Sequence, residues 1–225
     1  MLIFRRMILI DTSLSAFSPS AVVLAQGEYP SSPAVRRLLY DASHLVICDG
    51  ASKHLLTESA LNPALIIGDG DSIPLEVKEK YGHLFVHVSE QDTNDLTKAV
   101  NSCKERGWNR VIILGATGLR EDHTIANIFL LEEYRRMGME VRMVSDYGSF
   151  YPIIGDVTFK VQPKQQISLF PLSETPFSTE GLLYEIEKQG FSALWQASLN
   201  EAVGHEFVIS TSEPVIVYVA NEVKG

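Results

Sequence analysis

Short apolar runs alternate with amphipathic stretches from residue 21 to residue 144 of this 225-residue chain. The apolar runs have strand length, and the stretches between them carry helix signals such as Ser32-Pro33 at a start and Gly107 at an end. The predicted strands are 21–25, 44–48, 64–67, 84–88, 110–114 and 140–144, and the predicted helices are 34–42, 52–59, 74–81, 94–106 and 121–137. This alternation predicts an α/β domain with a mostly parallel sheet and helices on both faces.

The pattern changes after Asp146. Strand-like segments separated by turn-rich stretches follow, without a helix-period segment, at 153–161, 166–170, 182–186, 206–210 and 215–219. They predict a smaller, all-β, sandwich-like domain, so we expect an α/β catalytic domain at 1–148 and a β-rich domain at 149–225. The apolar segment 1–14 contains Arg5, Arg6 and Asp11 and is too short for a signal-peptide core or membrane span, so we interpret it as a terminal extension or added strand.

Composition narrows the choice of partners. Hydrophobic residues make up 45% of the chain and charged residues 21%, which is ordinary for a soluble protein. A net charge of −9 argues against a general binder of nucleic acids or anionic membranes, although a bound metal can reverse the local field for an anionic substrate. Cys48 and Cys103 form no metal-type cluster and predict buried free thiols in a reducing compartment. With no targeting signal recognised, we expect a cytoplasmic protein.

The acidic pair Asp69 and Asp71 follows the apolar run 64–67. Side chains two residues apart lie on the same side of a strand, and the carboxyl end of a parallel strand is where open α/β sheets bind ligands. Two neighbouring carboxylates are unfavourable without a cation between them, and Mg²⁺ prefers carboxylate and phosphate oxygens. An isolated Asp-x-Asp is also an ordinary polar turn, so the choice depends on the other loops.

Four polar clusters each follow a predicted strand and should meet at one sheet edge because of right-handed crossovers. The clusters are Asp49-Gly50, Asp69/Asp71, Gln91-Asp92-x-Asn94-Asp95-x-x-Lys98, and Gly115-x-x-Gly118-x-Arg120-x-Asp122-His123. Several acidic loops at one edge, together with Lys98 and Arg120, predict a site for a metal and phosphate groups.

The third cluster has two interpretations. Asp92, Asp95 and Lys98 are spaced i, i+3 and i+6 and can share one face of the first helical turns. Asp92 can alternatively cap this helix, where an acidic side chain complements the positive helix end. Asp95 is the better candidate for a metal ligand, and Lys98 either reaches a phosphate or is solvated.

The fourth cluster predicts an anion site at the start of the long helix. Gly115 and Gly118 let backbone N–H groups approach an anion, and Arg120 adds a bidentate contact. The loop is not a Walker A loop, because Gly-x-x-x-x-Gly-Lys-Ser/Thr is absent. His123, beside Asp122, is either a general base or a structural histidine.

These clusters, in this order, resemble the motifs of the thiamine pyrophosphokinase family. The family motifs are Asp-Gly-Gly, Gly-Asp-Phe-Asp-Ser, Asp-x-Thr-Asp with a following lysine, and Gly-Gly-Arg-x-Asp-His. Here they read Asp49-Gly50-Ala51, Gly68-Asp69-Gly70-Asp71-Ser72, Asp92-Thr93-Asn94-Asp95 with Lys98, and Gly118-Leu119-Arg120-Glu121-Asp122-His123. The resemblance covers about residues 21–145 by motif and extends to the C-terminus by architecture.

The sequence departs from these motifs at Ala51, Gly70, Asn94 and Leu119, and no departure removes a charged group. Metal and phosphate chemistry is therefore expected to be retained. We expect Leu119 to narrow the phosphate loop and Gly70 to remove an aromatic wall.

The resemblance implies transfer of diphosphate from ATP to the hydroxyethyl group of thiamine, giving thiamine diphosphate and AMP. Positioning and charge neutralisation are the main demands of such chemistry. By resemblance, Asp69, Asp71 and Asp95 are assigned to Mg²⁺, and Lys98 and Arg120 to the transferred group. Asp122 orients Arg120 or binds substrate, and Asp92 is a candidate acceptor of the alcohol proton. The remaining residues assigned to the ATP site are Asp49, Gly50, Gly115, Gly118 and His123.

For the acceptor, the resemblance points to Gln91 and to two residues of the second domain, Ser198 and Asn200. The alternative for the last two is an ordinary β-turn. Members of the family are homodimers whose sites form between subunits, and the same is expected here.

The sequence is compatible with two other functions. One is a related Mg²⁺-dependent phosphotransferase that acts on another alcohol or hydrolyses nucleotides, which Gly70 and Leu119 would favour. The other is a non-catalytic sensor of thiamine or nucleotide, against which the complete set of charged motif residues argues.

Overall fold

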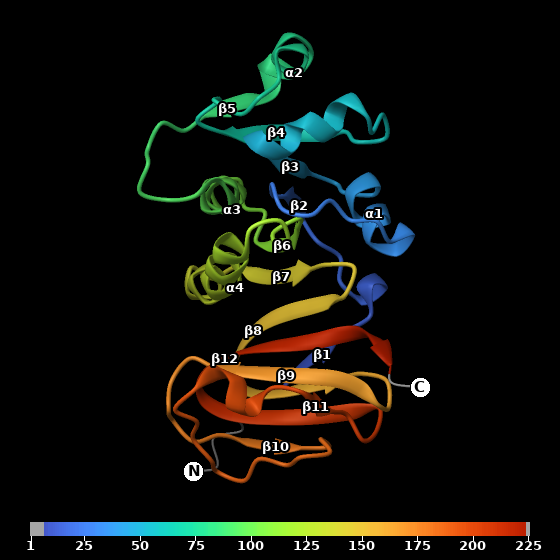
Figure 1. The fold of residues 1–225 in the computed structure, drawn as a ribbon, viewed down its shortest axis with the longest axis vertical. Helices are drawn as coiled ribbons and strands as arrows, with labels where there is room; N and C mark the ends of the chain where they lie inside the picture. Colours follow the sequence, from blue (N-terminus) through green and yellow to red (C-terminus); the bar gives the residue numbers. More distant parts are fainter. Residues whose placement is uncertain (1–6, 224–225) are drawn as a thin grey trace. The chain divides into compact units, whose positions relative to one another are not determined.

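The computed structural model describes residues 7–223. They form two compact units, one of residues 18–146 and one that combines residues 7–17 with residues 147–223. The first is an α/β unit and the second is smaller and rich in β structure, which confirms the predicted fold class (Figure 1).

The α/β unit contains a six-stranded, fully parallel sheet in the order β7-β6-β2-β3-β4-β5. Apolar side chains fill both faces of its central strands, and all four residues of β2 are buried. The strands are β2 (Ala21–Leu24), β3 (Leu45–Cys48), β4 (Pro63–Gly68), β5 (Phe85–His87), β6 (Arg110–Leu114) and β7 (Glu140–Val144).

Helices cover both faces of this sheet. The helical elements are α1 (Pro33–Tyr40), η2 (Asp49–Leu56), α2 (Leu75–Tyr81), η3 (Gly82–Leu84), α3 (Asp95–Glu105) and α4 (Glu121–Arg136). Because crossovers are right-handed and the strand order reverses at β2, α1, η2 and α2 cover one face, and α3 and α4 the other. Figure 1 shows α1 on one side of β2 and the pair α3 and α4 on the other. The loops that follow the strands therefore meet at one edge.

Local signals explain most of these elements. Pro33 opens α1 after Ser32, and Gly107 follows α3 with φ +75°, as expected for a residue beyond a helix end. The prediction for 52–59 was wrong in type and position, because the segment is a 3₁₀ helix that starts at Asp49. The first four residues of this helix, Asp49 to Ser52, are all buried, so the helix begins directly at the end of β3.

The β-rich unit pairs its strands in the order β11-β9-β12-β8, with β1 beside β8 and β10 beside β12. Its elements are β1 (Ile8–Asp11), η1 (Leu14–Ala16), β8 (Gly148–Lys160), β9 (Gln165–Pro171), β10 (Ser178–Glu180), η4 (Leu194–Ala197), β11 (Asn200–Glu201) and β12 (Glu206–Val223). The predicted N-terminal strand is present as β1, which runs parallel to β8 and so belongs to this unit. The remainder of that prediction, over residues 1–6, lies outside the described residues.

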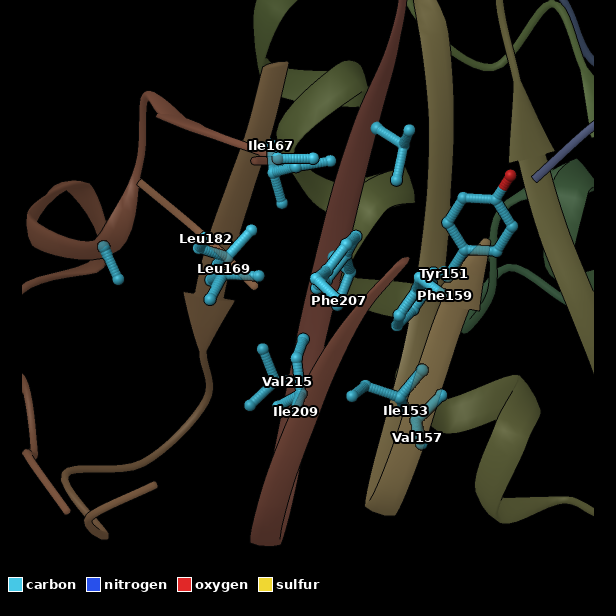
Figure 2. Packing of buried hydrophobic residues seen from close by; sticks show 14 of the residues in the cluster. Tyr151, Ile153, Val157, Phe159, Ile167, Leu169, Leu182, Phe207, Ile209 and Val215 are labelled. Atoms are coloured by element: carbon cyan, nitrogen blue, oxygen red, sulfur yellow. The ribbon is translucent and has the colours of Figure 1, made fainter. Parts of the chain in front are cut away.

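Inward-facing side chains of β8, β9 and β12 form the core of the β-rich unit (Figure 2). The rings of Phe159 and Phe207 stack with centroids 4.8 Å apart, and Tyr151 meets Phe159 edge to face. This core fixes the curved sheet on which the loops of residues 181–204 rest.

The structure confirms the strand character of 206–210 and 215–219 but differs from the predictions for this unit in two respects. Segments 206–210 and 215–219 belong to one strand, β12, in which the pairing with β8 shifts between Thr211 and Val215. Segment 182–186 is a loop with a single bridge, Leu182 to Ala202. No helix within residues 7–223 has the length and apolar character needed to span a membrane.

Candidate active site

A cavity of about 440 Å³ lies at the carboxyl ends of β2, β3, β4 and β6. The strand order reverses there, since β2 has the next strand along the chain on one side and β6 on the other. Open α/β sheets bind ligands at such a switch point. The polar residues that line the cavity are Gln26, Lys53, Asp69, Gln91, Thr93, Asn94, Asp95, Lys98, Arg120, His123 and Asn127.

Three carboxyl groups gather at one end of this cavity. Asp69 and Asp95 line it, and Asp49, which is 1% exposed, lies behind them and interacts with both. Burial and the neighbouring charge of Asp95 raise the pKa of Asp49 to about 6. The pKa of Asp69 is lowered, chiefly because the backbone N–H of Asp71 donates to it.

Gly68, the last residue of β4, makes room for the buried carboxyl group. A Cβ atom at this position would lie 2.4 Å from Cγ of Asp49, which is closer than any packed contact allows. The backbone N–H of Gly70 then donates to Oδ2 of Asp49 over 3.1 Å. The glycine at the strand end therefore allows Asp49 to lie beneath the acidic loop.

Lys98 supplies a positive charge beside this group. Its side chain is 3% exposed, and Nζ lies 3.2 Å from Oδ1 of Asp95, one helical turn earlier on α3. A buried ammonium group is stable only with such compensation. The cation is therefore held against the carboxylates and faces the cavity.

The start of α3 is capped by Asn94, whose side chain accepts the backbone N–H of Thr97 over 2.9 Å. The interpretation of Asp92 as the cap was wrong, since Asn94 occupies the capping position. Asp92 is exposed, and its backbone N–H donates to Glu90 over 2.8 Å. Asn94 also donates to Asn127 of α4, which donates to the Ala116 carbonyl and so ties the two loops together.

Arg120 and Asp122 form a bidentate ion pair at the start of α4. Nε of Arg120 donates to Oδ1 of Asp122 over 3.0 Å, and a second guanidinium nitrogen donates to Oδ2. The pair lowers the pKa of Asp122 and orients the guanidinium group at the cavity wall. His123 is exposed at the same wall, and its backbone N–H also donates to Asp122.

The cavity contains only part of the candidate set. Residues that line it are Asp69, Gln91, Asp95, Lys98, Gly118, Arg120 and His123. Residues near it that do not line it are Asp49, Gly50, Asp71, Asp92, Gly115 and Asp122. Asp71 is exposed, and Gly50 and Gly115 pack against Gln26 and Ala25 respectively. The cavity thus brings together two of the three proposed metal ligands with both proposed cations.

Sequence reasoning missed five polar cavity residues: Gln26, Lys53, Asn127, and both Thr93 and Asn94 as lining residues. Gln26 is the second residue after β2, so its place at the sheet edge was a usable signal. Lys53 lies in η2 and Asn127 lies inside α4, where no motif marked them.

The loop before α4 keeps a left-handed turn despite its leucine. Gly118 has φ +75° and Leu119 has φ +63°, a region that disfavours any residue with a Cβ atom. The Leu119 side chain is 71% exposed and lines the cavity. Leucine at this position therefore strains the loop and adds an apolar group at the cavity mouth.

Ser198 and Asn200 lie in the β-rich unit, just before and at the start of β11, among many exposed apolar side chains. Asn200 is buried, and its side chain bonds to both the N–H and the carbonyl of Tyr184, so it holds the neighbouring loop. Ser198 is half-buried and donates to the Trp195 carbonyl over 2.6 Å. The exposed apolar residues around them are Leu183, Tyr184, Leu194, Trp195, Leu199 and Val203.

The carboxylates at the cavity suit Mg²⁺ only if substrate phosphates and water complete its coordination. Within residues 7–223, no group of three or more His, Cys, Asp or Glu side chains is arranged to hold a metal ion. Mg²⁺, however, commonly binds through one or two carboxylates together with substrate phosphates and water. Asp69 and Asp95 meet that requirement, and their oxygens are the hard donors that this ion prefers.

Both units of the chain match known protein families. A sequence profile described as the catalytic domain of thiamin pyrophosphokinase matches residues 35–143, and one described as its substrate-binding domain matches residues 148–218. Thiamine pyrophosphokinase 1 of Oryza sativa subsp. japonica is 28% identical over 218 residues, covering 83% of this chain and 82% of the relative. Thiamin pyrophosphokinase 1 of Caenorhabditis elegans is 27% identical over 191 residues, covering 78% of each chain.

A solved structure shares the fold. The thiamin pyrophosphokinase from Candida albicans superposes with a TM-score of 0.79, covering 96% of this chain and 94% of that chain at 19% identity. The two profiles together span most of the chain, in the order in which the α/β and β-rich units occur. The chain belongs to the thiamin pyrophosphokinase family, a family of enzymes.

Proposed function

We propose that the protein transfers diphosphate from ATP to the hydroxyethyl group of thiamine and releases AMP. The observation that carries this proposal is the cavity at the switch point, where Asp69 and Asp95 face Lys98 and Arg120. Such a combination suits a polyphosphate and its metal better than a neutral ligand. Membership of a family named for this reaction supports the same conclusion.

Asp69 and Asp95 are the residues that we propose hold Mg²⁺, with Asp71 as a further ligand from the same loop. Bound there, the ion would neutralise charge on the phosphate oxygens. Asp49 lies behind both cavity carboxylates, where burial and the charge of Asp95 raise its pKa to about 6.

In the proposed reaction, the thiamine oxygen bonds to the β-phosphorus of ATP and the bond from that phosphorus to the α,β-bridging oxygen breaks. The electron pair stays on the oxygen of AMP, and the alcohol proton passes to a base, for which Asp92 is the candidate. Lys98 and Arg120 neutralise the diphosphate group in transfer, and the Asp122 pair fixes the guanidinium orientation. His123 and the backbone of the 115–118 loop contribute to nucleotide binding.

For thiamine, we propose Gln91 of the α/β unit and the exposed face around Ser198 in the β-rich unit. The exposed apolar side chains of that face, including Trp195 and Leu199, suit an aromatic ligand and a protein partner. A homodimer in which the β-rich unit of one subunit supplies this face to the cavity of the other is part of the proposal. Cys48 and Cys103, which are buried free thiols, suit the proposed cytoplasmic location.

An end-point reaction tests this function. The purified protein is incubated with ATP, Mg²⁺ and thiamine, and the products are separated by chromatography. Equal amounts of thiamine diphosphate and AMP, abolished by a chelator, are expected. ADP with thiamine monophosphate would overturn the two-phosphate transfer, and faster reaction with another alcohol would overturn the choice of acceptor.

A matched pair of variants locates the activity. Lys98→Met should abolish product formation, since its ammonium group lies at the cavity. Lys104→Met, on the exposed side of the same helix, should retain it. Equal activity in the two variants would exclude Lys98 from the reaction.

A further inference from the structure

Lys53 is a cation of the cavity that the assignments above leave without a role. It lies in η2, is exposed, and lines the cavity. The other two lysine or arginine residues of the lining have carboxylate partners, Lys98 with Asp95 and Arg120 with Asp122. Within the part of the chain that the structure describes, Lys53 has no ion pair, so its charge is available to a ligand.

Two carboxylates flank Lys53 in the chain, Asp49 at the start of η2 and Glu58 after its end, and neither forms an ion pair with it in the described part of the structure. Glu58 is paired with Arg36 and accepts a further bond from the Tyr40 hydroxyl. The neighbouring ring of His54 stacks on Tyr29 with centroids 4.2 Å apart. Burial, and secondly the charge of Lys53, lower the pKa of His54.

Lys53 enters the cavity from the opposite side of the sheet to the other two cations. It belongs to η2, which shares a face with α1, whereas Lys98 lies on α3 and Arg120 directly precedes α4. Figure 1 shows α3 and α4 on the other side of the strands from α1. A phosphate chain that crosses the switch point therefore meets cations at both ends.

We propose that Lys53 binds the α-phosphate of ATP, which becomes the phosphate of AMP. This inference rests on the proposed function, in which Lys98 and Arg120 hold the diphosphate in transfer on the α3 and α4 side. The remaining phosphate then lies toward η2, where Lys53 provides the compensating charge. Because cleavage leaves an additional negative charge on this phosphate, an ammonium group there stabilises the leaving nucleotide.

Binding of AMP, measured by calorimetry without thiamine, tests the proposal separately from turnover. Lys53→Met should weaken AMP binding about tenfold, the effect of losing roughly 1.4 kcal/mol. Lys53→Arg should restore most of it, and Lys104→Met, an exposed lysine outside the cavity, should bind as the unmodified protein does. Two further probes lack the α-phosphate: adenosine represents the nucleoside, and imidodiphosphate represents the diphosphate in transfer. Both should bind Lys53→Met with the same affinity as they bind the unmodified protein.

Three results would overturn the assignment. These are unchanged AMP binding in Lys53→Met, an equal loss for adenosine, and an equal loss for imidodiphosphate. If the unmodified protein makes thiamine diphosphate but Lys53→Met binds AMP normally, only the role of Lys53 fails. If it binds AMP through Lys53 but makes no thiamine diphosphate, the proposed acceptor fails and the phosphate contact stands.

Discussion

Asp49 offers a direct test of the electrostatics behind the cavity, through the variant Asp49→Asn. Its carboxyl group is 1% exposed, interacts with Asp69 and Asp95, and has a pKa raised from 3.8 to about 6. Asparagine has the same shape and can still accept the N–H of Gly70, but it carries no charge at any pH. The substitution therefore removes the charge and keeps the packing.

The sign of the effect follows from proton binding. Between the unfolded pKa of 3.8 and the folded pKa of about 6, the folded protein holds the Asp49 proton more tightly than the unfolded chain does. Raising the pH through this window therefore lowers the free energy of unfolding. With about 1.4 kcal/mol for each pKa unit, the loss is about 1 kcal/mol at pH 4.5 and about 3 kcal/mol at pH 7.

The assay is urea unfolding of the protein and the variant at several pH values between 4.5 and 7, in the presence of a chelator. The advantage of Asp49→Asn over the unmodified protein should grow by about 2 kcal/mol across this range. Other titrating groups are common to both proteins and cancel in the difference. Asp41→Asn, at an exposed position, is the control and should show no such growth.

A constant difference between Asp49→Asn and the unmodified protein from pH 4.5 to 7 would refute the reasoning. It would mean that Asp49 ionises with its ordinary pKa in the folded state. A loss of stability in the variant at pH 7 would refute it as well, since the charge would then be favourable.

Four further substitutions test the cavity. Asp69→Asn and Asp71→Asn should each lower kcat with Mg²⁺ about 100-fold or more, and a nearly normal Asp71→Asn would leave Asp69 with Asp95 as the metal site. Asp122→Asn removes one half of the bidentate pairing with Arg120, so kcat/KM for ATP should fall about tenfold in steady-state assays, and an unchanged value would contradict an orienting role. Leu119→Gly removes the strain of a left-handed leucine, about 1 kcal/mol, but glycine raises the conformational entropy of the unfolded chain by a similar free energy. The free energy of unfolding, measured by chemical denaturation, should therefore change by less than about 1 kcal/mol. A marked destabilisation would contradict the assigned strain.

The parallel sheet was predictable because its strands are uniformly apolar. Strands β2 and β3 are buried at every position, so continuous apolar runs marked them without ambiguity. The mostly apolar segment 182–186 also predicted a strand, and that prediction was wrong. There, side chains replace a partner strand, since Glu185 accepts the N–H groups of Gly181 and Leu182, and Asn200 accepts that of Tyr184.

The charged part of the site was also predictable, because acidic and basic residues followed the strands in a fixed order. The order of these residues could not predict how deeply each side chain is buried. Asp49, Asp69 and Asp71 look alike in sequence, yet the first is buried, the second lines the cavity and the third is exposed. Lys53 was missed because its approach to the cavity depends on which face of the sheet η2 covers, and no local motif encodes that.

The two departures from the family motifs at 70 and 119 have different structural meanings. Gly70 has φ +86°, and a Cβ atom there would lie 3.1 Å from the ring of Phe85, so an aromatic ring from β5 already occupies that space. Leu119 instead takes a left-handed conformation that glycine adopts without strain, and its exposed side chain extends at the cavity mouth. The loop thus keeps its backbone conformation while its wall changes. We therefore expect differences in substrate preference to arise at Leu119 rather than at Gly70.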